Sequence, residues 1–323
     1  MRYANRTMDP EAALRDLKDS NPRVRLQAAD ALGHVGEEYA NRACQALRPL
    51  LHDDRSDIRY SVALSLGELK DKEAIDSLIQ QMQGDGHPMA RQGAVIALGL
   101  IADPRAAPCL IEAISKGPAD VRFQAIASLA QIDPGAAQQP LRKALQDEDP
   151  EVRASAAATL SDIKDMNARE AIFALLEDFS PTVQIEAAMA LARLGDRRGT
   201  PVLIEHLEDK AYQHQAAEHL FHCPDRAAIP ALRQTLNRWL APPVIKVWAA
   251  GALWRLQEEE GRRQLLALLG SRRQMVRGLC IQVLGEISEP WARQALQYLA
   301  ASRAGESWQE EISEALHPKG KIA

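Results

Sequence analysis

The feature that most constrains this chain is an internal repeat with a period of about 31 residues. Nine similar segments follow one another, and each can be aligned on one position that we call the register position. The register positions are Arg25, Arg59, Arg91, Arg122, Arg153, Gln184, Gln213, Lys246 and Arg277. A leucine stands seven residues after each of them: Leu32, Leu66, Leu98, Leu129, Leu160, Leu191, Leu220, Leu253 and Leu284. A chain built this way is expected to fold as a stack of similar units.

Each segment has the pattern of two helices. The residues one before, three after and seven after a register position are mostly apolar and lie on one face of a helix. A second apolar run precedes each of these helices, for example residues 110–114 and 172–176. Proline stands three residues before five register positions, where its fixed φ suits the first helical turn. The sequence therefore predicts an all-α fold, a right-handed α-solenoid of about nine two-helix repeats.

The repeats resemble a known family. Residues 147–160, DEDPEVRASAAATL, are similar to HEAT-like repeats of the type named after phycobilisome lyases, and the resemblance covers residues 10–303. It implies a ladder in which an aspartate of the turn between the two helices pairs with an arginine at the register position. The matching pairs here are Asp19 with Arg25, Asp53 with Arg59, Asp85 with Arg91, and Asp147 with Arg153. Lys116 replaces the aspartate in the fourth repeat and Gln184 replaces the arginine in the sixth, and repeats seven to nine lack the pair.

We expect one solenoid domain over residues 1–323. Residues 10–195 form its regular repeats, and residues 196–288 form divergent ones. Residues 289–323 are expected to be a C-terminal cap and tail that cover the last apolar face. All five tryptophans lie at or after Trp239, outside the regular repeats.

Composition, charge and the lack of known motifs argue against several classes of function. The formal net charge of -5 argues against a dedicated binder of nucleic acid or anionic membranes. The longest notable uncharged apolar stretch, residues 93–102, is too short to span a bilayer, and residues 1–6 do not resemble a secretory signal. Four widely spaced cysteines suit reduced, mostly buried thiols, so a cytoplasmic protein is expected. No hydrolase, P-loop, zinc-protease or nucleotide-binding motif occurs, and we expect no enzyme activity and no cofactor.

Large apolar side chains occur where a solvated helix face needs none. They lie one, two or five residues after a register position, opposite the buried stripe. The residues are Tyr60, Leu64, Ile96, Phe123, Ile185, Met189, Val247 and Trp248. We expect them to line a concave face that binds a protein or peptide, with Tyr60 and Phe123 exposed. Partial burial between neighbouring second helices is the alternative.

Histidines gather in the seventh repeat. His214, Glu218 and His222 are spaced four apart, so they share one helix face, and such a set is a candidate transition-metal site. A polar face in a shortened repeat explains the same residues. Deoxyhypusine hydroxylase, a HEAT-like enzyme, carries paired His-Glu motifs on separate repeats, whereas this chain has both its pairs in one repeat and in reversed order.

The ninth repeat concentrates arginine. Arg262, Arg263, Arg272, Arg273 and Arg277 favour a surface helix face or an acidic partner segment over nucleic acid, because the residues 258–260 are all glutamate. We therefore expect a non-catalytic scaffold or adaptor that binds a protein or peptide of unknown identity. The alternative is a metal-binding or bilin-handling HEAT-like enzyme subunit that uses the seventh-repeat cluster. Nucleic-acid binding through the ninth repeat is a minor alternative.

Overall fold

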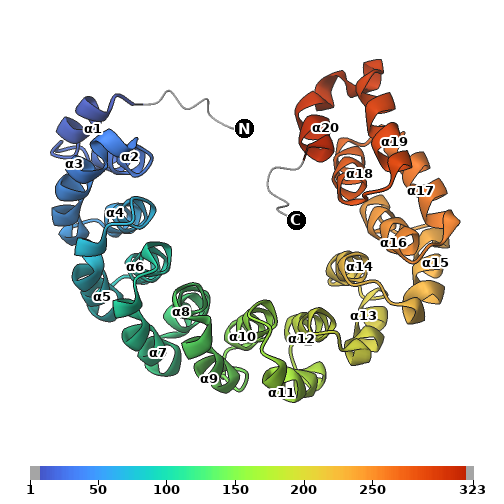
Figure 1. Cartoon of the computed structure of the whole chain (residues 1–323), viewed down its shortest axis with the longest axis horizontal. Helices are drawn as coiled ribbons and strands as arrows, with labels where there is room; N and C mark the ends of the chain where they lie inside the picture. The colour runs from blue at the N-terminus through green and yellow to red at the C-terminus, as the bar shows by residue number, and fades with distance from the viewer. Residues whose placement is uncertain (1–7, 318–323) are drawn as a thin grey trace. The chain divides into compact units, whose positions relative to one another are not determined.

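The computed structural model describes residues 8–317, and its regular structure is helical throughout: no strand occurs in that range. The predicted all-α fold, a solenoid of two-helix repeats, is confirmed (Figure 1). The chain divides into two compact units, unit 1 (Met1–Ala171) and unit 2 (Ile172–Ala323). The predicted single domain over 1–323 and its subdivisions stay a prediction, and its residues 1–7 and 318–323 lie outside the described range.

Unit 1 contains ten complete helices. They are α1 (Pro10–Asp16), α2 (Pro22–Gly33), α3 (Glu37–Leu47), α4 (Ser56–Glu68), α5 (Ile75–Gly84), α6 (Pro88–Ile101), α7 (Ala107–Lys116), α8 (Ala119–Ile132), α9 (Pro134–Ala144) and α10 (Pro150–Asp162). Short 3-10 helices join some of them: η1 (Arg48–His52), η2 (Lys72–Ala74), η3 (Pro104–Ala106) and η4 (Met166–Ala168). The helix α11 (Arg169–Ala174) begins in unit 1 and ends in unit 2.

Unit 2 continues the alternation. Its helices are α12 (Pro181–Arg193), α13 (Thr200–His206), α14 (Gln213–His222), α15 (Ile229–Asn237), α16 (Pro243–Arg255), α17 (Glu259–Leu269), α18 (Gln274–Glu286), α19 (Pro290–Ala300) and α20 (Gln309–Leu316). The 3-10 helices are η5 (Leu175–Glu177), η6 (Arg197–Gly199), η7 (Arg226–Ala228) and η8 (Arg303–Trp308). The last pair, α19 and α20, follows the nine repeats.

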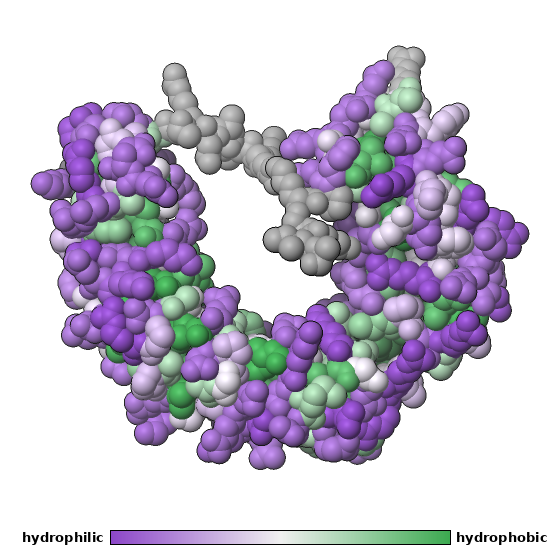
Figure 2. Space-filling view, in the orientation of Figure 1, coloured by the Kyte–Doolittle hydropathy of each residue, from purple (hydrophilic) through white to green (hydrophobic). Residues whose placement is uncertain are grey.

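Within each unit the helices form two rows (Figure 1). The even-numbered helices α2 to α10 in unit 1, and α12 to α18 in unit 2, carry the register positions and form what we call the second-helix row. The odd-numbered helices form the first-helix row. All nine register leucines are buried between the rows. Figure 2 shows the result on one face, where hydrophobic side chains lie among a mostly hydrophilic surface in both units.

Proline and polar caps determine where the second helices begin. Pro22 and Pro150 occupy the first turns of α2 and α10, as the sequence predicts, because a helix needs no N–H there. The side chains of Asn21 and Asp149 accept hydrogen bonds from backbone N–H groups of the same turns, Arg23 N at 3.1 Å and Glu151 N at 2.8 Å. Pro88, Pro181 and Pro243 occupy the corresponding turns of α6, α12 and α16.

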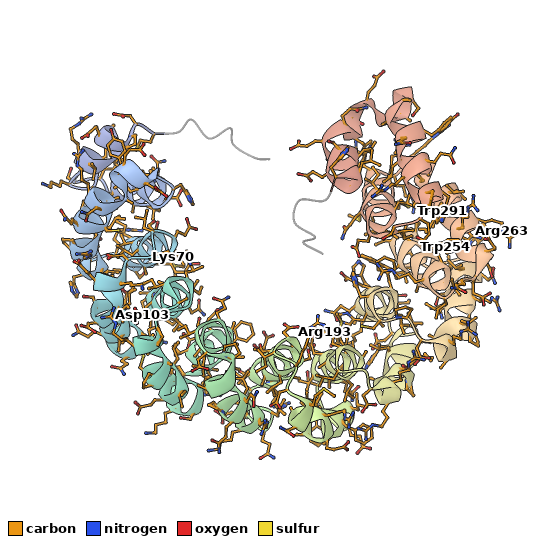
Figure 3. All side chains as sticks on the ribbon, viewed as in Figure 1. Lys70, Asp103, Arg193, Trp254, Arg263 and Trp291 are labelled. Atoms are coloured by element: carbon orange, nitrogen blue, oxygen red, sulfur yellow. The ribbon has the colours of Figure 1, made fainter. Side chains whose placement is uncertain are left out.

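The turn from one repeat to the next is stabilised by an aspartate cap. At η2, η3, η4, η6 and η7 an aspartate starts the 3-10 helix by accepting a hydrogen bond from the N–H two residues later, for example Asp103 from Arg105 and Asp165 from Asn167. Except at η7, where Pro224 stands, the residue before the aspartate closes the preceding helix in the left-handed region, as Ala102 does at φ 55°. Figure 3 shows Asp103 in the first-helix row of unit 1.

Neighbouring second helices approach closely through glycine and serine. A Cβ on Gly99 would lie 2.7 Å from the Ser128 Oγ, and one on Gly33 would lie 2.7 Å from the Ser65 Oγ. Each serine uses that proximity to donate to a carbonyl of the facing helix, Ser65 to Ala29 at 2.8 Å and Ser128 to Val95 at 3.0 Å. The glycines therefore allow close packing between neighbouring second helices.

The predicted ladder is present in unit 1. The Nε and Nη2 atoms of Arg25 donate to Asp53 at 2.9 and 3.1 Å, and those of Arg59 donate to Asp85 at 2.7 Å each. Each arginine therefore bonds the aspartate of the next repeat, which corrects the expected pairing with the aspartate of its own turn, such as Asp53 with Arg59. Its own turn supplies a backbone carbonyl instead, such as Asp53 O to Arg59 Nη1 at 2.8 Å. Charge-assisted forks of this kind link one repeat to the next.

Candidate functional site

Half of the predicted concave-face residues lie in unit 1 and keep accessible surface. Tyr60 and Leu64 on α4, Ile96 on α6 and Phe123 on α8 are half-buried. Tyr60 packs against the next helix, because a Cβ on Gly93 would lie 2.8 Å from the tyrosine ring. These four side chains give the second-helix row of unit 1 an apolar strip, and their role in binding a partner stays a prediction.

The other half lie in unit 2 and are not exposed. Ile185, Met189, Val247 and Trp248 are all buried, Trp248 with 2% of its surface accessible. The exposure that the sequence analysis expects of these four is therefore corrected. Helical periodicity places them on the face away from the first-helix row, but side chains of the adjacent second helix cover that face.

An aromatic cluster covers Trp248. The Trp248 ring centroid lies 5.3 Å from that of Phe221, 5.8 Å from that of His222 and 6.3 Å from that of His214. The indole Nε1 of Trp248 donates to His214 Nε2 at 3.4 Å. Trp248 therefore joins α14 to α16 and belongs to the core of unit 2.

The histidines of the seventh repeat point to different partners. His214 Nδ1 lies 3.7 Å from Glu218, whereas His222 Nδ1 lies 3.6 Å from Glu286 on α18. One nitrogen of His214 already accepts from Trp248. In the part of the chain that the structure describes, no three His, Cys, Asp or Glu side chains are grouped as metal ligands would be. His214, Glu218 and His222 thus do not converge on a common point.

His219, also on α14, is mostly buried, with 13% of its side chain accessible. Burial lowers the pKa of His219 to about 4, with nearby Arg193 and His222 acting in the same direction. Glu186 Oε1 lies 3.9 Å from its Nε2, too far for a hydrogen bond. His219 is therefore neutral at physiological pH.

The cysteines are poor nucleophiles. Cys44 and Cys280 are buried, and burial raises the pKa of Cys44 to about 11 and that of Cys280 to about 12. Cys109 and Cys223 are half-buried, and burial raises their pKa values too. None of the four forms a disulfide, and the thiol of Cys109 donates to Ala106 O at 2.9 Å.

The arginines of the ninth repeat divide among several sites. Arg262 and Arg263 lie on α17, Arg272 and Arg273 lie in the turn before α18, and Arg277 on α18 donates to Ala304 O at 3.1 Å. The Arg262 guanidinium lies 5.3 Å from the centroid of the Trp291 ring. Glu260, of the acidic run upstream, bonds Arg233 at 3.2 Å. Nucleic-acid binding by these arginines stays a prediction.

A pocket of about 510 Å³ opens between α17 and α19 and combines apolar, aromatic and basic side chains. Its walls include Arg262, Leu266, Leu269, Trp291 and Tyr298. Trp291 is backed by Trp254, with ring centroids 4.9 Å apart, and Figure 3 shows the two side by side. Tyr298 and Leu266 are exposed. Pockets with mostly apolar walls and a few polar groups are typical of small-molecule sites.

A set of exposed apolar residues was not predicted. Phe179, Trp239, Leu240 and Met275 are largely exposed and lie in or next to turns between the two helices of repeats in unit 2. Helical periodicity identifies candidate binding residues only on helix faces, so it gives no information about these turns. Their signal is an aromatic or aliphatic residue at a turn position that is polar in unit 1, such as Asp54.

Comparison with known proteins supplies the family. The model for HEAT repeats matches residues 9–66, 56–130, 110–171 and 138–220, which together cover more than half of the chain. A curated relative, the bilin biosynthesis protein PecE of Mastigocladus laminosus, is 28% identical over 132 residues, 38% of this chain. That alignment spans about half of the relative's length, 48%.

The solved structure of YibA agrees on the fold. The Escherichia coli protein YibA is 22% identical, with a TM-score of 0.53 over 79% of this chain and 99% of YibA. The complex of CpcE and CpcF of phycocyanin lyase from Nostoc sp. PCC7120 matches at 23% identity and a TM-score of 0.40, over 82% of this chain and 95% of that one. In residues 8–317 no helix is both long and apolar enough to cross a membrane.

The PecE match corrects one expectation and confirms another. The sequence analysis expects no enzyme, and a relative named for bilin biosynthesis overturns that expectation because it points to an enzyme-like role. The resemblance to HEAT-like repeats of the phycobilisome-lyase type is confirmed. The chain belongs to the HEAT-repeat family.

Proposed function

We propose that this protein is an enzyme-like subunit that handles a bilin together with a protein partner. The observation that carries the proposal is the 132-residue match to PecE, a bilin biosynthesis protein. The helical repeats supply the scaffold on which both the bilin and the partner are held. Because the match covers about half of PecE, the bilin-handling role is a proposal for this chain.

The pocket between α17 and α19 has the chemistry that a bilin needs. A bilin is a conjugated linear tetrapyrrole with carboxylate side chains, so its site must combine apolar walls with a cation. Leu266, Leu269 and the Trp291 ring provide apolar contact, and Arg262 provides the cation beside that ring. We place the bilin there. A part for His214, Glu218 and His222 in the same activity stays a prediction.

The test is a titration with biliverdin followed by absorbance. We expect wild-type protein to bind and to shift the absorption band, whereas Arg262→Gln and Leu266→Asp weaken binding by about tenfold or more, equivalent to about 1.4 kcal/mol. Arg263→Gln is the matched control, because Arg263 is an exposed neighbour that does not line the pocket. Wild-type protein that binds no bilin contradicts the function, and unchanged binding by both pocket variants contradicts only the location.

The partner is proposed to bind the apolar strip on the second-helix row of unit 1. Tyr60, Leu64, Ile96 and Phe123 support this placement because they remain accessible although they are apolar. Replacing Phe123 by Ser and Ile96 by Thr is expected to reduce co-purification of the partner from the native source while the helical circular dichroism stays the same. Capture that is unchanged in the folded double variant places the partner elsewhere.

A further inference from the structure

The arginine ladder of unit 1 is incomplete at one position. Arg25 and Arg59 each use Nε and Nη2 on one carboxylate, whereas Arg91 has only Nη2 on Asp120 at 3.3 Å and Nη1 on Asp85 O at 3.0 Å. The Nε of Arg91 is buried and has no hydrogen-bond partner among the described residues. Of the two guanidinium nitrogens, Nε and Nη2, that bind an aspartate elsewhere, only Nη2 therefore binds one here.

The local sequence explains the difference. Where the ladder needs an aspartate, the turn between α7 and α8 has Lys116, Gly117 and Pro118. The helix α7 ends at Lys116, and its C-cap is Gly117, which has no side chain to offer. Lys116 itself donates to Glu112 at 3.1 Å, one turn back on the same helix. No carboxylate from this turn reaches Arg91 as Asp85 reaches Arg59.

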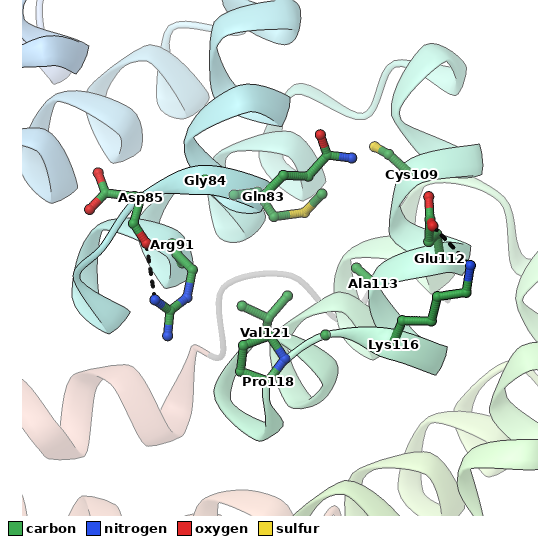
Figure 4. A pocket seen from close by; sticks show the side chains of 12 residues that line it. Gln83, Gly84, Asp85, Arg91, Cys109, Glu112, Ala113, Lys116, Pro118 and Val121 are labelled. Carbon is green, nitrogen blue, oxygen red and sulfur yellow. Dashed lines mark hydrogen bonds and ion pairs between the residues drawn. The ribbon is translucent and has the colours of Figure 1, made fainter.

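A pocket of about 410 Å³ lies at the same place. Figure 4 shows Arg91 bonded to Asp85 on one side of the pocket and the pair of Glu112 and Lys116 on the other. The walls between them include the apolar side chains of Met82, Pro118 and Val121. The missing aspartate therefore leaves more space than one carboxylate needs, and part of that space is apolar.

Two neighbours show that these features are specific to this position. Arg122 also has an Nε without a partner, but its Nη2 donates to Asp147 at 2.6 Å, so its turn does supply an acid. In unit 2, where Gln184 holds the register position, its Oε1 lies 3.0 Å from His206 Nε2, and this contact stands where unit 1 has an arginine–aspartate pair. In the described part of unit 1, only Arg91 combines a turn that supplies no aspartate, a buried Nε without a hydrogen-bond partner and an adjoining pocket; its one carboxylate contact is the single bond to Asp120 on α8.

We propose that this pocket binds a carboxylate ligand with an apolar stem. Its carboxylate accepts from Arg91 Nε and Nη2, as Asp53 and Asp85 do from Arg25 and Arg59, and its stem packs on Met82, Pro118 and Val121. Binding is non-covalent, because the Cys109 thiol that lines the pocket donates to Ala106 O and has a raised pKa. This inference does not depend on the bilin proposal, which concerns a pocket of unit 2.

The probe is 4-phenylbutyrate, and the matched neutral ligand is 4-phenylbutanamide. We expect calorimetry or ligand-observed NMR to detect the acid and to find the amide at least tenfold weaker, since a neutral amide cannot replace a carboxylate on a guanidinium fork. Equal binding of the two ligands, or no binding of the acid up to 10 mM, about the range of a very weak ligand, overturns the proposal.

The variant is Arg91→Gln, and its control is Arg25→Gln. Gln184 naturally holds the same register position and keeps the bond to its turn, donating to Asp178 O at 2.7 Å, so the variant is expected to fold. Arg91→Gln should weaken binding of 4-phenylbutyrate at least tenfold, whereas Arg25→Gln, which disrupts a complete fork far from the pocket, should leave it unchanged. Retained binding in Arg91→Gln overturns the assignment, and so does an equal loss in both variants.

Competition identifies the natural source of the carboxylate. Displacement of 4-phenylbutyrate by biliverdin, but not by its dimethyl ester, supports a bilin carboxylate in this pocket. Displacement by a short peptide with a glutamate beside an apolar residue, with no effect of biliverdin, supports the same carboxylate site filled by an acidic side chain. Displacement by the dimethyl ester as strongly as by biliverdin contradicts recognition of a carboxylate.

Discussion

The two units connect their repeats with different chemistry. In unit 1, Arg25 and Arg59 reach across to Asp53 and Asp85, and these ionic interactions are largely shielded from solvent. In unit 2, the equivalent positions carry no such pair, and Trp248 instead fills the space between α14 and α16 against Phe221. The same two-helix repeat is therefore stabilised either by a charged ladder along its turns or by aromatic side chains between its second helices.

This difference has a consequence for function. A charged ladder holds the turns of unit 1 and leaves apolar residues of the second-helix row accessible. Aromatic packing in unit 2 buries the equivalent residues, and there the exposed apolar side chains lie in the turns instead, as Trp239 and Phe179 do. The surface on which each unit can bind an apolar ligand thus depends on which chemistry holds its repeats together.

The largest expected effect is in the aromatic cluster. Trp248→Ala should lower the free energy of unfolding by about 3–5 kcal/mol, because it leaves a cavity between α14 and α16. Trp239→Ala is the matched control: its side chain is 91% exposed, and the change should stay within about 0.5 kcal/mol. Urea unfolding with hydrogen exchange measures both and assigns the loss to unit 2. Similar losses from the two variants would mean that Trp248 does not hold its neighbours together.

Acid should destabilise unit 2 before unit 1. His219 has a folded-state pKa of about 4 against about 6.5 when unfolded, so the unfolded chain binds a proton first. Its contribution is fully present above pH 6.5 and is lost as the pH falls towards 4, on the order of 3 kcal/mol in total. Stability measured from pH 7 to 4 should show that slope in the wild type and in His34→Leu, which alters an exposed histidine of unit 1. His219→Leu should be nearly flat over the same range, and a persistent slope would assign the acid sensitivity to another group.

The ion pairs of the unit 1 ladder should lose their stabilising effect only at a lower pH than His219 does. The hydrogen bond from Arg59 lowers the pKa of Asp85, so the stability that this carboxylate adds is present above the ordinary aspartate value of about 3.9 and is lost as the pH falls through its lower folded-state pKa. Asp85→Asn should cost roughly 2 kcal/mol at pH 7, because it weakens charged hydrogen bonds to Arg59. The variant should also lose less stability than the wild type below pH 4. An Asn variant as acid-sensitive as the wild type would contradict this account of the ladder.

Several elements of this fold follow directly from the sequence. The register leucines are buried in every repeat because the helical period fixes which face meets the first-helix row. The residues of the ladder also follow, since the turn aspartate and the register arginine recur at a fixed separation of six residues. The expected pairing within one turn is wrong, however, because Arg25 bonds the Asp53 carboxylate and only the backbone carbonyl of Asp19. What the resemblance did not specify is that the arginine bonds the aspartate of the following repeat and the backbone of its own turn.

The burial of Trp248 and Ile185 could not be predicted in the same way. Periodicity assigns a residue to a face of its helix, but the distance to the neighbouring helix decides whether that face is covered. That distance depends on which side chains lie opposite, such as Phe221 and His214, and these come from another repeat. The candidate pockets could not be predicted from the sequence either. Arg91 and Arg262 look like ordinary surface residues until the positions of their neighbours are known.

The turns between repeats have a sequence signal of their own. Asp71, Asp103, Asp165, Asp196 and Asp225 each precede a small residue by three positions, Ala74, Ala106, Ala168, Gly199 and Ala228. The aspartate caps the 3-10 helix and the small residue is buried beneath it, for example at 0% exposure for Ala168. A search for this spacing would locate the turns between repeats in both units.

The smallest effects are expected from exchanging glycine and alanine at those turns. The exchange tests whether both units end their second helices in the same way. Gly195 in unit 2 has φ of 78° with no atom within 4 Å of an added Cβ, and Ala102 in unit 1 has φ of 55°. Gly195→Ala should therefore destabilise by about 1 kcal/mol through backbone strain alone, while Ala102→Gly should stabilise by up to about 1 kcal/mol. Thermal unfolding of the two variants and of the double exchange gives the sign of each change. Because the sites lie in different units, the two changes should add in the double variant; shifts of the same sign would contradict a common left-handed helix end.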